Sequence, residues 1–312
     1  MNIAKIHITR HSLLNNITTL STTDDIECLI DKLETKLKKY AYSKNIIINC
    51  PIDLFDYSID NINLEDKLLE AVNDDFIAFQ YYFSNLEKII TRYIKYDDTD
   101  RIMSLINEQG TLGFPRHYAF CIEPTSQWPN IELNLHTYSW ENTLKLNSDF
   151  IAQHHTDVTQ FISWSKENYE FLDFHDDIED TLHSIKIGDY TNYKQLVSHA
   201  LNCLNQSYHF ISNDPQKNQD DLNVISEYTQ RIGRSLSCSR QGSTKLHWDF
   251  FNTNSNENET INCEYHLKIN WDDYGNKIPR GNGNPVRIYF GLKSYPGFER
   301  KQIKIAHIGK HL

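Results

Sequence analysis

The last 29 residues, 284–312, carry the pattern that most constrains this fold: two runs of alternating apolar and polar residues joined by a Gly/Pro turn. VRIYF (286–290) and QIKIAHI (302–308) alternate with a period of two, as strands with one buried face do. Two similar runs precede them, KLHWDFF (245–251) and CEYHLKINW (263–271), separated by Asn- and Gly-rich connectors. The pattern therefore predicts an antiparallel meander at this end of the chain.

A strand and several helices are predicted immediately upstream of the meander. YEFLDF (169–174) is a short strand, and helical patterns follow from about Asp176, over 189–211 and over 222–233. The helix over 189–211 places its apolar residues on one inner face. These elements predict a domain with the order strand, helices, antiparallel strands over residues 166–312.

The first half of the chain has a different pattern. Helices are predicted over 24–41, with Asp24 as the N-cap, and over 64–72 and 75–95. Short apolar runs predict strands at 3–9, 45–49, 117–123 and 131–140. The sequence thus predicts an acidic α+β domain over residues 1–165, and an α+β class for the whole chain.

Charge is divided unevenly between the two halves. The 312 residues carry a formal net charge of −11, but residues 231–312 hold 13 Lys and Arg against 7 Asp and Glu. Residues 1–230 therefore hold 18 basic and 35 acidic residues. This split favours a basic working surface attached to an acidic body, with chance and solubility as the plain alternative.

The sequence lacks the signatures of several classes of protein. No run of 18 apolar residues exists, and the opening MNIAKIHITRHSLLNN lacks a signal-peptide apolar block. The six cysteines include no C-x-x-C pair. HHTD (154–157) and FHDD (174–177) place His beside Asp without a spacing that pairs them, and no G-x-G-x-x-G or phosphate loop is present. We expect a cytoplasmic protein with reduced thiols, no membrane association, no metal and no cofactor.

Four stretches of residues 168–312 resemble the small RelE/ParE-type toxins. FHDDIEDTLHSI (174–185) is similar to their opening strand and first helix, and GRSLSCSRQGSTKLHWDF (233–250) to the segment that leads into their second strand. VRIYF resembles their Y-R-I-x-Y strand, and IKIAHIG (303–309) the strand before their last turn. This chain departs from them by extra residues at 252–263 and 272–284 and by a final His-Ile-Gly-Lys-His.

The resemblance implies a bacterial toxin or phage-defence effector that acts as a metal-independent endoribonuclease through its basic antiparallel sheet. In such a reaction the ribose 2′-hydroxyl attacks the neighbouring phosphate. The reaction needs a base for that hydroxyl, cations for the charge that builds on the phosphate, and an acid for the departing 5′-oxygen. Arginine suits the second role through its planar fork, and histidine suits the proton transfers. The implied partners are RNA or the ribosome and an antitoxin or other inhibitory protein.

The candidate residues follow from this chemistry and from strand alternation. Arg287 lies where the toxins carry a strand arginine, and it shares a face with Tyr289. Strict alternation places His307 with the isoleucines, whereas Gly309 frees the residues after it to reach a ligand. The predicted catalytic residues are Arg287, His311, Lys310, Lys245 and His247, and the predicted nucleic-acid-binding residues are Arg240, Tyr289, Arg234, Lys304 and His307.

Three further interpretations stay open at this point. Trp248, Tyr265 and Trp271 could stack on bases, although strand aromatics usually belong to the core. The basic sheet could bind nucleic acid or an acidic protein without catalysis, beside an acidic regulatory or oligomerising domain. The acidic half could also cover the basic half as a built-in inhibitor.

Overall fold

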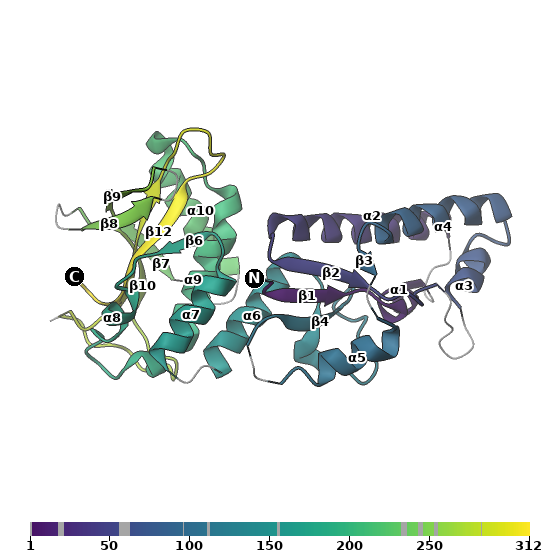
Figure 1. The fold of residues 1–312 in the computed structure, drawn as a ribbon, viewed down its shortest axis with the longest axis horizontal. Coiled ribbons are helices and arrows are strands. Elements are labelled where there is room, and N and C mark those ends of the chain that lie inside the picture. The colour runs from purple at the N-terminus through teal and green to yellow at the C-terminus, as the bar shows by residue number, and fades with distance from the viewer. Residues whose placement is uncertain are drawn as a thin grey trace. The chain divides into compact units, whose positions relative to one another are not determined.

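The computed structural model describes most of the chain. The described ranges are 2–17, 22–55, 63–95, 97–110, 113–154, 157–231, 236–242, 246–252, 255–281 and 283–312. They divide into two compact units, residues 1–147 and 148–312 (Figure 1). Helices and both parallel and antiparallel strands are present, so the predicted α+β class is confirmed.

The N-terminal unit is built on a sheet of five described strands in the order β3-β2-β1-β4-β5, with every neighbouring pair parallel. Parallel strands need crossover connections, and helices supply them here, with α2 and α4 on one side of the sheet and α5 on the other (Figure 1). The strands are β1 (Ala4–His7), β2 (Ile46–Cys50), β3 (Ile94–Lys95), β4 (Arg116–Phe120) and β5 (His136–Thr137). The helices are α1 (Arg10–Ile17), α2 (Thr23–Lys39), α3 (Leu64–Ala71), α4 (Phe76–Ile90), α5 (Thr99–Asn107) and α6 (Trp140–His154).

Two local predictions for this unit were wrong. Helix α2 is capped by Thr22 and not by Asp24, because the Thr22 side chain accepts from Asp25 N while the Asp25 side chain accepts from Thr22 N. The strand predicted over 131–140 is reduced to β5, since a 3₁₀ turn precedes it and α6 begins at Trp140.

The C-terminal unit contains the predicted strand, helices and meander. Its main sheet has the order β6-β12-β11-β10-β7; β6 lies parallel to β12 and the other neighbours are antiparallel. Helices α9 and α10 pack together, and each also contacts the sheet. The strands are β6 (Leu172–Phe174), β7 (Ser237–Arg240), β10 (Tyr265–Ile269), β11 (Val286–Lys293) and β12 (Gln302–Lys310), and the helices are α7 (Val158–Asn168), α8 (Ile178–Leu182), α9 (Lys194–Ser207) and α10 (Asn218–Arg231).

The boundary between the units falls within α6, whereas the sequence placed it after residue 165. Helix α7 lies on the C-terminal side of this division because it packs against that unit. The Phe161 ring lies 5.8 Å from the Tyr190 ring, and the Thr159 hydroxyl donates to Glu179.

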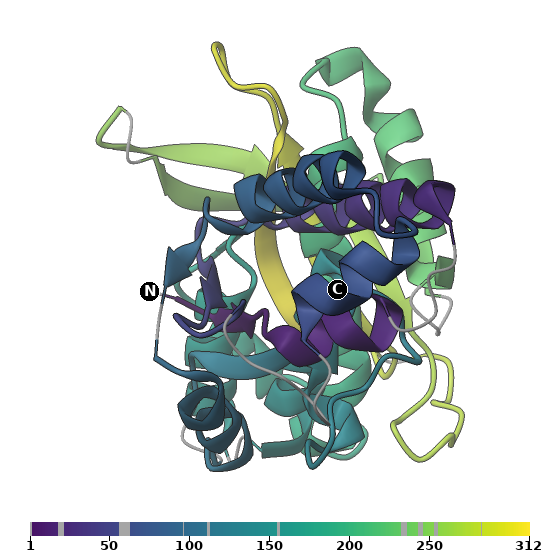
Figure 2. The same cartoon turned by 90° about the vertical axis from the view of Figure 1, so that its right-hand side faces the viewer.

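The segment predicted as the first meander strand forms a separate hairpin. Among the described strands, β8 (His247–Asn252) and β9 (Glu257–Asn262) pair only with each other, and they project from the main sheet (Figure 2), so the meander begins with β7. Phe250 and Ile261 pack with Cys263 and Ala306, which seats the base of the hairpin on the sheet. Phe250 of β8 is thus buried by packing against the sheet, although β8 is not paired within that sheet.

A stacked histidine pair joins β1 and β4 in the N-terminal unit. His7 Nε2 and His117 Nδ1 lie 3.0 Å apart, and His7 is fully buried. Burial first, and then the charge of His117, lowers the pKa of His7 from 6.5 to about 3. The accepting ring must be neutral, and because burial lowers the pKa of both His7 and His117, both imidazoles are neutral at pH 7.

Acidification should therefore destabilise the N-terminal unit. Between about pH 6.5 and 3 the unfolded chain binds a proton at residue 7 that the folded unit does not, so stability falls by up to about 1.4 kcal/mol per pH unit through this group as the pH drops. Hydrogen exchange of β1 and β4 across this range measures the fall. His7→Asn should reduce the slope, with His11 and His117 accounting for part of the remainder, and His183→Gln, an exposed control, should not; equal slopes in all three proteins would contradict this account.

Candidate functional site

A β-bulge in β12 determines which side chains share the candidate site. Tyr289 pairs with His307 and Phe290 pairs with Ile305, so Ala306 is an extra residue in the strand. The prediction that His307 lies with Ile303 and Ile305 was wrong for this reason. The bulge shifts the alternation by one residue and places His307 on the face of Tyr289.

Three neighbouring strands carry polar side chains to this face. His266 of β10 pairs with Tyr289 of β11, which pairs with His307 of β12. The Tyr289 ring lies 5.1 Å from the His266 ring and 5.7 Å from the His307 ring. His311 adds its ring at 6.2 Å from His266 and 6.4 Å from Tyr289. Three imidazoles and a phenol therefore form one cluster.

Arg287 and Lys268 lie beside this cluster as a directly opposed pair on β11 and β10. Arg287 is only 7% exposed, and its Nη1 donates to Val286 O, Ile269 O and Asn270 Oδ1 at 2.8, 3.4 and 3.2 Å. Its Nε has no hydrogen-bond partner among the described residues. No side-chain carboxylate in the described ranges forms an ion pair with Arg287 or Lys268.

Four other cations of the unit do have such partners. Lys301 pairs with Asp221, Lys304 with Asp173, Arg240 with Glu264 and Lys293 with Glu259. A buried charge without a counter-charge is costly, so proteins seldom keep one unless it serves a ligand. Among the described residues of the unit, Arg287 therefore differs from the other buried cations, Lys301 and Lys304, which are both ion-paired; Lys268 adds a second positive charge beside it.

Burial keeps the imidazoles neutral. It lowers the pKa of His266 to about 4, with further lowering by the charges of Arg287 and Lys268. Burial also lowers the pKa of His307 to about 4 and, to a smaller degree, the pKa of the more exposed His311. At neutral pH these rings are available to accept a proton, and an anion bound beside them would raise their pKa.

The residues after β12 are held across this face. His307 Nε2 donates to Lys310 O at 2.9 Å, which fixes the tautomer of that ring. Tyr289 donates its hydroxyl proton to Gln241 Oε1 at 3.0 Å and accepts from Leu312 N at 3.1 Å. His311 N donates to Gly283 O at 3.1 Å. These bonds set the position of the His311 ring above the cluster.

Gly309 has a role that the sequence did not reveal. It lies within β12 and does not redirect the chain, but it allows α8 to approach: a Cβ at this position would lie 2.2 Å from Thr181 O and 2.3 Å from Ser184 Oγ. The same two residues accept hydrogen bonds from backbone N–H groups at the edge of β12: Thr181 Oγ1 accepts from Ile308 N, and Ser184 Oγ accepts from Lys310 N.

Gly309→Ala should therefore destabilise the C-terminal unit by about 1–3 kcal/mol, since backbone atoms must move to admit the methyl group. Denaturant unfolding followed by far-UV circular dichroism measures the change. Gly242→Ala is the matched control, because no described residue other than its chain neighbour places an atom within 4 Å of a Cβ there. Equal midpoints for the two variants would contradict the close approach of α8.

The structure gathers only part of the predicted site. Arg287, Tyr289 and His307 share one face, and the His311 ring lies beside them. Lys310 pairs with Val286, whose side chain lies on the opposite face, so the prediction that groups Lys310 with Arg287 was wrong and only the backbone O of Lys310 contacts His307. Lys304 lies at the far end of that face, beside Asp173 and the rings of Phe250 and Tyr295. Arg240 extends from the edge strand to Glu264, and His247 is exposed on the separate hairpin. Lys245 and Arg234 lie outside the described residues.

His266 and Lys268 are members of the cluster that the sequence analysis missed. They alternate with Tyr265, Leu267 and Ile269, so the period of two already placed them on one polar face of β10. Ser239 of β7 extends the same face, with its hydroxyl 3.1 Å from His266 Nε2.

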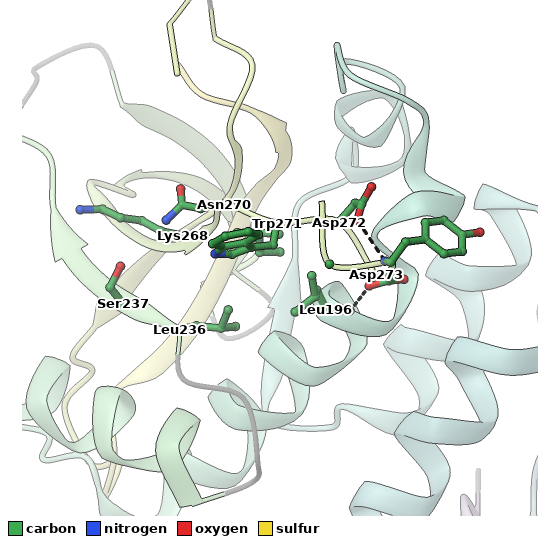
Figure 3. A pocket seen from close by; sticks show the side chains of 11 residues that line it. Leu196, Leu236, Ser237, Lys268, Asn270, Trp271, Asp272 and Asp273 are labelled. Atoms are coloured by element: carbon green, nitrogen blue, oxygen red, sulfur yellow. Dashed lines mark hydrogen bonds between the residues drawn. The ribbon is translucent and has the colours of Figure 1, made fainter. Parts of the chain in front are cut away.

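A pocket of about 640 Å³ adjoins this face at the end of β10 (Figure 3). Lys268 and Ser237 belong to both the pocket and the polar face. Its remaining walls come from Leu196, Leu236 and the loop that runs from Asn270 to Gly275.

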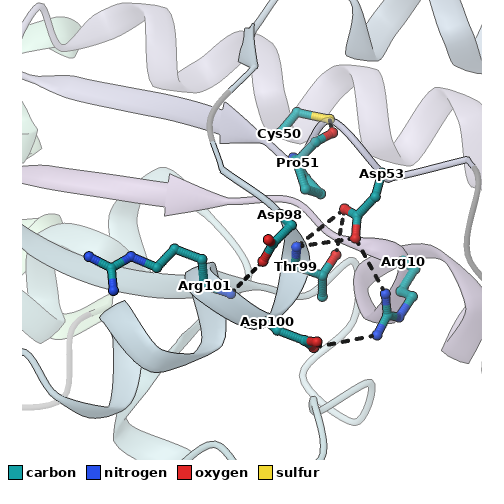
Figure 4. Close-up of polar contacts among 8 residues, drawn as sticks. All are labelled: Arg10, Cys50, Pro51, Asp53, Asp98, Thr99, Asp100 and Arg101. Carbon is teal, nitrogen blue, oxygen red and sulfur yellow. Dashed lines mark hydrogen bonds and ion pairs between the residues drawn. The ribbon is translucent and has the colours of Figure 1, made fainter.

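A second polar cluster lies in the N-terminal unit, at the carboxyl ends of β1, β2 and β3, an edge where open parallel sheets often bind ligands (Figure 4). Arg10 lies 3.7 Å from Asp53 and 3.9 Å from Asp100, and Asp53 accepts from the backbone and hydroxyl of Thr99. Arg10 thus has two carboxylates beside it, and these contacts, with the bonds from Thr99 to Asp53, connect the loops that follow the three strands.

Two further kinds of feature matter for the described residues, metal sites and membrane-spanning helices. Across these ranges, no group of three or more His, Cys, Asp or Glu side chains is arranged to hold a metal ion. None of their helices combines the length and the apolar character needed to cross a membrane. The chain matches no family model, no curated protein and no solved structure. The geometry of the cluster is therefore the basis for assigning a function.

Proposed function

We propose that the C-terminal unit is a metal-independent endoribonuclease of the RelE type, acting as a bacterial toxin or phage-defence effector. One observation carries the proposal: Arg287 and Lys268 have no side-chain carboxylate partner in the described ranges and lie beside three imidazoles with lowered pKa values. The order strand, helices, meander and the motif resemblance support it. RNA or the ribosome is the proposed substrate, and an inhibitory protein the proposed partner.

In this mechanism the 2′-oxygen bonds to phosphorus and the bond from phosphorus to the 5′-oxygen breaks. An imidazole accepts the 2′-hydroxyl proton, and the imidazolium so formed donates a proton to the departing 5′-oxygen, which leaves a 2′,3′-cyclic phosphate and a 5′-hydroxyl. His311, the most exposed imidazole, is the proposed proton carrier. Lys268 contacts the phosphate, and Arg287 stabilises the growing negative charge from below.

The test uses the full chain and end-labelled single-stranded RNA in the presence of a chelator. We expect products with 2′,3′-cyclic phosphate ends, no cleavage where the attacking nucleotide is 2′-deoxy, and a loss of about 10²–10⁴-fold in rate for His311→Ala. Salt-sensitive binding without cleavage would instead select the non-catalytic binding module. Failure to bind and to cleave would overturn both.

Induced expression in a bacterial host tests the biological side of the proposal. Slower growth that His311→Ala relieves is the expected outcome. If the wild-type protein cleaves RNA in vitro but does not slow growth, the toxin assignment is wrong and the endoribonuclease assignment stands.

A further inference from the structure

The pocket at the end of β10 joins an apolar floor to the unbalanced cations. Leu196 and Leu236 line it from one side, and Lys268 lines it from the polar face (Figure 3). Asn270, also in its wall, accepts from Arg287 Nη1. A ligand that filled the pocket would therefore lie next to the positions where the proposed function requires a phosphate.

Trp271 and Tyr274 are the aromatic residues of the pocket. Their exposed fractions are 50% and 76%, so neither ring contributes much to the core. Lys277 Nζ lies 5.7 Å from the centre of the Trp271 ring. The backbones of Lys277 and Trp271 pair as an isolated antiparallel β-bridge. A large aromatic ring held at the wall of a pocket and left half in solvent is typical of a surface on which a nucleic-acid base stacks.

The two acidic residues of the pocket restrict what it can hold. Asp273 accepts from Gln195 N and Leu196 N at the start of α9, and Asp272 accepts from Tyr274 N and Asn276 N. Both carboxylates fix the loop, and their negative charge disfavours a phosphate inside the pocket. The phosphate is thus directed to Lys268 and Arg287, and an uncharged ring fits the pocket.

We infer that this pocket binds one unpaired base of the RNA, stacked on Trp271, with the adjoining phosphate at Lys268 and Arg287. The inference rests on the proposed function and adds a substrate requirement to it. A base inside a duplex is already stacked and paired, so the RNA must be single-stranded at this nucleotide.

The test measures binding and not cleavage. Its probe is an eight-nucleotide oligoadenylate in which all riboses are 2′-deoxy and one nucleotide, at a position moved along the strand, lacks its base. The wild type should lose affinity by about 5–150-fold when the abasic nucleotide occupies the pocket. Trp271→Ala should bind the complete strand with an affinity reduced by a similar factor, and its affinity should not depend on the position of the abasic nucleotide. Trp271→Phe should keep most of the affinity.

Phe251→Ala is the matched control, because Phe251 is 53% exposed on the β8–β9 hairpin, outside the pocket. It should bind like the wild type. If Trp271→Ala binds the oligonucleotide as tightly as Phe251→Ala does, base stacking on Trp271 is contradicted. The same holds if the wild type binds duplex and single strand equally well. Neither result contradicts the proposed nuclease activity. No binding of the oligonucleotide or of the matching RNA by the wild type would overturn both.

Discussion

Replacing Arg287 with methionine should reduce RNA cleavage by about 10²–10³-fold while leaving the C-terminal unit as stable as before, or more so. The loss of activity follows because the guanidinium is the buried cation nearest the proposed phosphate. Stability is preserved because the change removes a charge that no side-chain carboxylate balances in the described ranges. Initial cleavage rates and thermal unfolding of the same preparations measure the two effects.

Arg240→Met is the control, for which we expect the opposite result: lower stability and unchanged RNA cleavage. Its partner Glu264 is buried, so losing Arg240 leaves a buried carboxylate without its cation. This variant should unfold at a lower temperature and cleave RNA at the wild-type rate while folded. If Arg287→Met instead melted far below the wild type and still cleaved RNA, Arg287 would be a structural residue and the site would lie elsewhere.

Lys301→Met should produce the largest loss of stability. Lys301 and Asp221 are both almost fully buried and form an ion pair, and Asp221 also accepts from Ser212 N at 2.8 Å. Removing the cation leaves Asp221 buried and charged, at a cost of about 3–5 kcal/mol. For a unit of this size that lowers the unfolding temperature by roughly 6–20 °C, measured by calorimetry.

A second variant separates the lost ion pair from lost packing. Lys301→Met with Asp221→Asn removes both charges and retains an oxygen for Ser212 N, so it should recover most of the stability. Lys32→Met, which breaks an exposed pair with Glu123, should change nothing measurable. A double variant no more stable than Lys301→Met would show that packing of the lysine stem, and not its charge, is what matters.

Periodicity predicted most of the elements of the C-terminal unit because alternation is a local property. The same period also marked Arg287 and Tyr289 as one face, and it would have added His266 and Lys268. It could not locate His307, because a bulge is one extra residue whose identity, alanine, carries no signal of its own. Strand pairing is non-local as well, so neither the parallel order of the N-terminal sheet nor the departure of β8 from the meander followed from the sequence.

The extra residue at Ala306 also affects how this strand tolerates insertion and deletion. In a loop, one residue more or fewer alters only the length of a connection. Here the loss of Ala306 would remove the bulge and restore simple alternation: Ile305 would stay on the face of Phe290, and His307 would stay on the face of Tyr289. A related chain that lacks only this residue would thus be shorter by one and keep every member of the cluster.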